Sequence, residues 1–114
     1  MISFQEFQKM DLQIGKVIEV KGVEGAENLL KLKVDFGEKP SKSSGREIRQ
    51  IIAGIAKFYK AEDLLGKDIV VIVNLEPKRV FGLESQGMLL AADVEGEPIL
   101  LLPDKKVPPG TKIR

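Results

Sequence analysis

Residues 30–36 constrain the fold most strongly, because apolar and charged side chains alternate there without a break. One parity is wholly apolar and the other wholly charged: Leu30, Leu32, Val34 and Phe36 against Lys31, Lys33 and Asp35. Successive side chains of a strand point to opposite faces of a sheet, so the pattern predicts a half-buried antiparallel strand. The charged parity is expected to face solvent.

Other segments predict further strands and two short helices. Strands are expected over about 12–20, 47–55, 69–73, 88–92 and 98–102, with Gly15 suggesting a bulge in the first. Ser3 and Glu6 have capping-box spacing, which predicts a helix over about residues 3–9. A second helix is expected at 61–65, closed by Gly66. We expect loops at 24–28 and 37–46, an irregular segment at 74–87 and a hairpin turn at 94–97.

This order of elements favours a small all-β barrel. The helix at 61–65 falls between the third and fourth strands, where an OB-fold places its helix. We therefore predict a five-stranded OB-fold barrel with short helices. The chain has 114 residues, which suits a single domain over 1–114.

Composition excludes most enzyme chemistry. The chain contains no Cys and no His, which removes thiolate nucleophiles, imidazole bases and nearly all zinc sites. We expect no catalytic residue, no metal and no cofactor. No apolar run approaches the roughly 18 residues of a membrane span, and the N-terminus lacks the pattern of a signal peptide. We therefore expect a cytoplasmic protein without a membrane partner.

Positive charge is concentrated although the whole chain is nearly neutral at +1. Residues 42–60 hold five cations against one acid, Glu47: Lys42, Arg46, Arg49, Lys57 and Lys60. A run of this size is most often a solvated surface. Its position around a predicted strand also suits phosphate binding, with Lys78 and Arg79 as a second basic pair.

Aromatic residues are too few for a dedicated reader of single strands. Phe58, Tyr59 and Phe81 could stack on bases, although each fits a core position at least as well. Recognition of RNA shape and backbone therefore suits the sequence better than recognition of base sequence.

Five motifs in order resemble one known family. These are residues 4–15, 29–37 and 49–55, the pair of segments 74–78 and 82–92, and the tail with 103–105 and 107–110. Together they resemble the tRNA-binding domain of free-standing structure-specific tRNA-binding proteins and of methionyl-tRNA synthetases. The CsaA proteins belong to the same family. The sequence departs from the family at 22–28, which gains acids, and at Gln13, where Arg is common.

The resemblance implies an OB-fold with a small C-terminal β extension, about 93–114, through which members form homodimers. It implies binding of tRNA by shape, for delivery to an aminoacyl-tRNA synthetase, with the methionyl enzyme as the expected partner. Ser85 and Met88 join the candidate tRNA-binding residues on the resemblance alone. For Met88 a packed core position is equally expected. The full candidate set is Lys42, Arg46, Arg49, Lys57, Lys78, Arg79, Ser85 and Met88.

Two other functions stay open at this point. The same barrel face could bind peptides or dock a synthetase, in a chaperone-like or adaptor dimer. A general binder of single-stranded nucleic acid would instead bind oligonucleotides as well as it binds tRNA.

Overall fold

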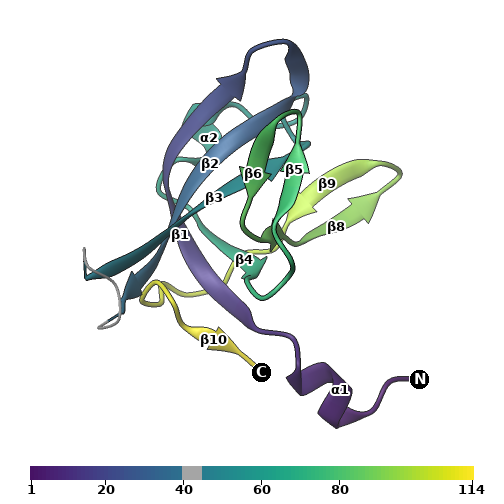
Figure 1. Cartoon of the computed structure of the whole chain (residues 1–114), viewed down its shortest axis with the longest axis vertical. Coiled ribbons are helices and arrows are strands. Elements are labelled where there is room, and N and C mark those ends of the chain that lie inside the picture. Colours follow the sequence, from purple (N-terminus) through teal and green to yellow (C-terminus); the bar gives the residue numbers. More distant parts are fainter. Residues whose placement is uncertain (40–44) are drawn as a thin grey trace.

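A computed structural model gives the fold of the chain and describes residues 1–39 and 45–114. Strands form most of it, and the main sheet curls around a single core (Figure 1). The helices are α1 (Phe4–Gln8) and α2 (Ala61–Leu64). The strands are β1 (Leu12–Val23), β2 (Ala26–Glu38), β3 (Arg46–Ala53), β4 (Asp68–Ile72), β5 (Lys78–Val80), β6 (Leu83–Ser85), β7 (Met88–Leu89), β8 (Ala91–Val94), β9 (Glu97–Leu100) and β10 (Lys112–Ile113). The predicted all-β class is confirmed.

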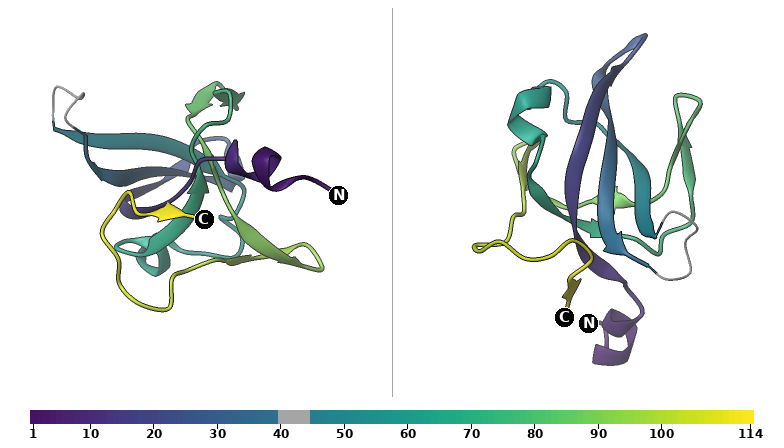
Figure 2. Two further views of the ribbon diagram at one scale, coloured as in Figure 1. Left: turned by 90° about the horizontal axis from the view of Figure 1, so that it is seen from below. Right: turned by 90° about the vertical axis from the view of Figure 1, so that its left-hand side faces the viewer.

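The main sheet has the strand order β3-β2-β1-β4-β7, and β10 adds to the start of β1. All its pairs are antiparallel. The two longest strands, β1 and β2, have 12 and 13 residues and lie side by side (Figure 2). Helix α2 connects β3 to β4, as the OB-fold prediction requires, and the curled sheet is OB-like.

The strongly bent β1 owes its path to a glycine and a bulge. A Cβ at Gly15 would lie 2.4 Å from Val34 Cγ1 and 2.7 Å from Phe36 Cε1, so only glycine lets β1 approach the core this closely. The predicted bulge lies further along, between Val17 and Glu19. Because the bulge shifts the parity of β1, Val17 is buried and Ile18 is exposed, opposite to the sequence pattern.

The core confirms the alternation of apolar and charged side chains in residues 30–36. The apolar parity of β2 is buried, and residues of β1, β3, β4 and α2 pack against it. One polar residue departs from the pattern, because Asp35 is only 9% exposed. Its carboxylate accepts a hydrogen bond from the Gly37 N–H at 2.8 Å.

The barrel is closed between β3 and the segment before β7 by a serine and a glutamine. Gln86 N–H donates to the Gln50 carbonyl at 2.8 Å, and Gln86 Oε1 accepts from the Gln50 N–H at 2.9 Å. Ser85 Oγ accepts from the Ile52 N–H and donates to the Gly87 carbonyl, both at 3.0 Å. The Ser-Gln-Gly turn therefore joins β3 to the other side of the sheet.

Both predicted helices are confirmed, as is the hairpin around residues 94–97. The Ser3 and Glu6 side chains form the predicted capping box of α1. Strands β8 and β9 form a separate two-stranded sheet that projects from the barrel (Figure 1). It is tied to the core region by Tyr59, whose hydroxyl donates to the Pro98 carbonyl at 3.1 Å. The role of 93–114 as a dimerisation extension stays a prediction.

Three segments are more regular than the sequence suggested. The expected loop at 24–28 is a tight turn, because Val23 already pairs with Ala26. The expected irregular segment 74–87 contains the β5–β6 hairpin. Its turn residues Phe81 and Gly82 have φ angles of 52° and 79°, where Asn-Gly would have been the recognisable signal. The two-residue strand β10 was too short to predict.

Candidate nucleic-acid interface

Arg46, one of the predicted phosphate ligands, is engaged by acids of its own chain. Arg46 Nη2 lies 2.9 Å from Asp35 Oδ2, and Nη1 lies 3.8 Å from Glu38 Oε1. The hydrogen bonds that Arg46 donates to Asp35, and the negative charge of that carboxylate, raise the pKa of Arg46 above its ordinary value, with a smaller contribution from Glu38. The guanidinium therefore stays charged, and its charge is balanced at the start of β3. Lys42 lies outside the described residues.

Arg49 is also held inside the protein. Its Nη1 donates to the carbonyl oxygens of Val73 and Gln86, and its Nη2 lies 3.1 Å from Glu47 Oε2. The guanidinium carbon lies 6.0 Å from the centroid of the Phe36 ring. The side chain thus ties β3 to both ends of the segment that connects β4 to β7.

Ser85 is 6% exposed, and its hydroxyl both accepts and donates within the barrel. Met88, the other residue taken from the family resemblance, is 50% exposed. Met88 therefore offers a surface that a partner could touch, whereas Ser85 shapes the turn beside it.

The exposed basic residues lie on loops and hairpin ends. Lys78 and Arg79 project from β5, and both are exposed. Arg79 Nη1 donates to the Gly82 carbonyl at 2.9 Å, which steadies the side chain across the hairpin turn. Lys57 is exposed on the segment between β3 and α2. Arg46 is exposed as well, but its guanidinium lies against Asp35 and Glu38. Among the described basic candidates, Lys57, Lys78 and Arg79 are therefore the ones most open to phosphates.

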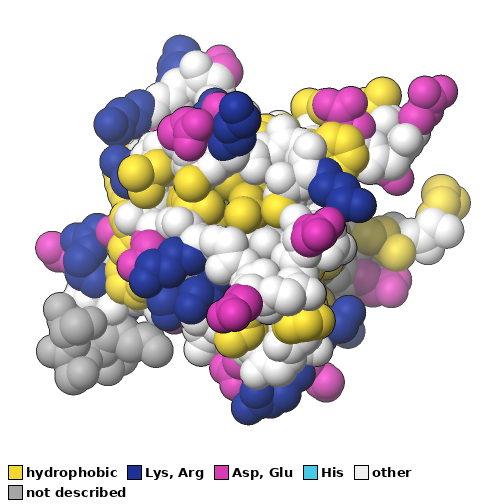
Figure 3. Space-filling view, turned by 90° about the horizontal axis from the view of Figure 1, so that it is seen from above, with side chains coloured by type: hydrophobic (Ala, Val, Ile, Leu, Met, Phe, Trp, Pro, Cys, Tyr) yellow, Lys and Arg dark blue, Asp and Glu magenta, His cyan; other side chains and the backbone are white. Residues whose placement is uncertain are grey.

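A groove lies between the β1–β2 turn and the β5–β6 hairpin, with a volume of about 480 Å³. Its lining consists of Gly25, Ala26, Glu27, Asn28, Leu29, Lys57, Val80 and Phe81. Viewed from above, hydrophobic side chains gather near the middle of this end of the molecule, bordered by Lys and Arg with acids among them (Figure 3). The groove thus combines an apolar floor with a lysine, an amide and one carboxylate.

The segment that departs from the family, 22–28, supplies one wall of this groove. The other departure, Gln13, is 5% exposed and donates to both carboxylate oxygens of Asp11 at 3.1 Å. Position 13 therefore belongs to the interior, and a change there does not alter an exposed charged face.

Of the three aromatic residues considered as stackers, two are open to solvent. Phe81 is 61% exposed and Phe58 is 48% exposed. Tyr59 packs against the core and its hydroxyl is hydrogen-bonded at 3.1 Å to the Pro98 carbonyl. Sequence reasoning could not separate these three, because their neighbours in the fold decide which ring is covered.

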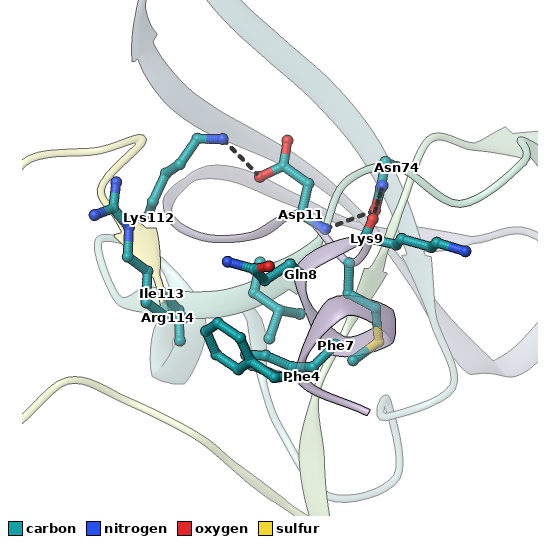
Figure 4. A pocket seen from close by; sticks show the side chains of 11 residues that line it. Phe4, Phe7, Gln8, Lys9, Asp11, Asn74, Lys112, Ile113 and Arg114 are labelled. Atoms are coloured by element: carbon teal, nitrogen blue, oxygen red, sulfur yellow. Dashed lines mark hydrogen bonds and ion pairs between the residues drawn. The ribbon is translucent and has the colours of Figure 1, made fainter. Parts of the chain in front are cut away.

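A pocket of about 550 Å³ lies elsewhere, between α1 and the C-terminal end. Figure 4 shows Phe4 and Phe7 lining it together with Lys112 and Arg114. Lys112 Nζ lies 3.6 Å from Asp11 Oδ1, so one of the cations that line this pocket is already paired.

Among residues 1–39 and 45–114, no group of His, Cys, Asp or Glu could hold a metal ion. The same residues include no helix long and apolar enough to cross a membrane.

Comparison with known proteins identifies a family and close relatives. Residues 12–112 match the family described as "Putative tRNA binding domain". A methionine–tRNA ligase of Methanothrix thermoacetophila is 51% identical over 113 residues, which are 99% of this chain and 16% of that protein. The enzyme of Thermococcus kodakarensis is 52% identical over 114 residues, 14% of its length. The chain thus spans about a sixth or less of these relatives.

Solved structures of two kinds share the fold. A MetRS-related protein from Pyrococcus horikoshii has a TM-score of 0.87 and 35% identity, covering 100% of this chain and 98% of that one. The chaperone CsaA from Bacillus anthracis has a TM-score of 0.84 and 37% identity, covering 100% and 99%. With a family match over 12–112 and such relatives, the chain belongs to the tRNA-binding domain family.

Proposed function

We propose that this chain binds tRNA through its shape and backbone, with little preference for base sequence. The family match over residues 12–112 carries the proposal. The exposed positions of Lys57 in the groove, and of Lys78 and Arg79 on the β5 strand whose Val80 lines it, support the proposal. Phosphate contacts need cations that are not already paired. Met88 contributes an exposed apolar side chain on β7.

Arg49 and Ser85 act in this proposal as positioning residues. Each uses its hydrogen-bonding groups to hold the 73–87 segment, which carries Lys78 and Arg79. Arg46 supports the start of β3 through Asp35, and Lys42 remains a candidate phosphate contact from the sequence alone.

The module performs no chemistry of its own and serves an aminoacyl-tRNA synthetase, most directly the methionyl enzyme. Its relatives are segments of methionine–tRNA ligases that make up 14–16% of those proteins. Binding by such a segment raises the local concentration of tRNA near a catalytic site, so modest affinity suffices. This role places the protein in the cytoplasm, with tRNA and a synthetase as partners.

We further propose a homodimer formed through residues 93–114. This region exposes Val94, Ile99, Leu101 and Leu102 at 41–55% of their surface. Several exposed apolar side chains on the β8–β9 sheet and directly after it favour burial against a second copy. Light scattering at a series of protein concentrations tests the dimer, and Ile99→Glu should shift the mass to that of one chain.

Fluorescence anisotropy with labelled tRNA across a salt series tests the main proposal. We expect micromolar binding that weakens with salt and is not displaced by a short single strand of equal charge. Lys78→Gln should weaken binding. It should also make the slope of log K against log salt, here called the salt slope, shallower by about 0.7–0.9. Lys105→Gln, on the tail away from the groove, is the matched control and should change neither. No binding of tRNA at low salt would overturn the proposal.

The similarity to CsaA favours one second candidate, a chaperone-like dimer that binds peptides on the same face. Binding of an unfolded polypeptide that persists at high salt, together with weak tRNA binding, would favour it. Competition between tRNA and the polypeptide would place both on one surface.

A further inference from the structure

We infer that Phe81 and its groove form a stacking site for one unpaired nucleobase of the bound RNA, an inference that rests on the proposed function. Phe81 is the second most exposed phenylalanine among the described residues, at 61%. It stands at the tip of the β5–β6 hairpin and lines the groove that also contains Lys57.

The backbone at Phe81 gives the first argument. Its φ of 52° and the φ of 79° at Gly82 describe the left-handed pair of a tight hairpin turn. Asn or Gly is favoured at the first of these positions, and a bulky residue there is an outlier. The ring is nevertheless 61% exposed, and backbone outliers of this kind gather at binding sites.

The surroundings of the ring give the second argument. The ring approaches the opposite turn at Gly25, where even a Cβ would lie 3.4 Å from Phe81 Cζ. Because residue 25 is glycine, no side chain there covers the ring. Each nucleobase offers a π-face of the kind that stacks on such exposed aromatics.

Polar groups at the groove match the rest of a nucleotide. Lys57 is exposed and supplies a cation for the phosphate. The exposed Asn28 side chain makes no hydrogen bond to the described residues, so its amide is available to the edge of a base. Glu27 on the same wall disfavours a second phosphate there. One base with one phosphate therefore fits better than a continuous strand.

The test uses a substitution that should not harm the fold. Phe81→Asn installs the residue that the turn prefers, so the unfolding temperature should stay the same or rise. Affinity for tRNA should nevertheless fall about 5- to 150-fold, the range found for loss of one stacked base. The salt slope should be unchanged, because no phosphate contact is removed. Glu95→Asn, at the equivalent position of the β8–β9 turn with φ of 53°, is the matched control and should leave binding unchanged.

Fluorescence gives an independent readout, because the chain contains no Trp. Phe81→Trp places the sole indole in the groove, and tRNA should quench it with the same midpoint as the anisotropy titration. Phe58→Trp, the other exposed aromatic position, should not be quenched. If tRNA binds while Phe81→Asn keeps full affinity and Phe81→Trp is not quenched, the stacking site is refuted and the proposed function stands. If wild-type protein fails to bind tRNA, both are refuted.

Discussion

Replacing Arg49 with Met separates a positioning residue from a phosphate ligand. The substitution keeps the apolar stem beside Phe36 and removes a guanidinium that donates to the Val73 and Gln86 carbonyls and pairs with Glu47. Hydrogen bonds to charged groups contribute about 1.5–3 kcal/mol each when buried. Because the Arg49 side chain is 25% exposed, water can replace part of this loss. We expect the free energy of unfolding to fall by about 2–4 kcal/mol.

Urea denaturation measures this change, and thermal unfolding should show a midpoint lower by about 8–16 °C for a chain of this size. Binding of tRNA should weaken, because the segment with Lys78 and Arg79 loses its anchor. The slope of log K against log salt should stay that of the wild type, since no phosphate contact is lost. Arg49→Lys distinguishes the two roles further, because it keeps the charge and loses the planar fork.

A direct phosphate ligand would behave in the opposite way. Arg49→Met would then keep wild-type stability and lower the salt slope by about 0.7–0.9, and Arg49→Lys would restore most of the affinity. That combination would refute the assignment of Arg49 to positioning.

Two further substitutions test the fold. Gly15→Ala should destabilise the protein by about 1–3 kcal/mol in urea denaturation, because its Cβ would lie 2.4 Å from Val34 Cγ1. Gly22→Ala is the control and should cost far less, since no atom lies within 4 Å of its Cβ. Equal effects of the two substitutions would contradict the packing argument. Ser85→Ala should lower the free energy of unfolding by about 1–3 kcal/mol. It should also speed hydrogen exchange at the Ile52 amide, which donates to Ser85 Oγ at 3.0 Å. Unchanged exchange would show that the barrel closes without this bond.

The strand pattern was the part of the fold that local sequence could predict. The alternation in residues 30–36 holds in the structure because β2 pairs on both sides and buries one face. In β1 the predicted burial of Ile18 was wrong. The strand has a bulge there that depends on its pairing with β2 and leaves no clear signal in the local sequence. The β5–β6 hairpin was missed because Phe81 occupies a turn position where Asn or Gly is the usual sign.

The candidate site was harder to predict, because charge in a sequence carries no information about its partners. Arg46 and Lys57 look alike in a count of cations. In the fold, Asp35 lies 2.9 Å from Arg46, while Lys57 is exposed beside a groove. Asp35 was expected at the solvent face, yet it is buried and anchors both Arg46 and the Gly37 turn.

This redistribution of charge predicts how strongly salt should affect binding to one protomer. If Lys57, Lys78 and Arg79 make the phosphate contacts, the slope of log K against log salt should be about −2.1 to −2.7. Affinity should then fall about 20- to 40-fold between 50 and 200 mM salt. If Lys42, Arg46 and Arg49 also contacted phosphates, the slope of log K against log salt would approach about −4.2 to −5.4 and the loss would be roughly 300- to 1,800-fold. A steep slope would therefore mean that the ion pairs of β3 open on binding, whereas a shallow one would confine tRNA to the loop end of the barrel.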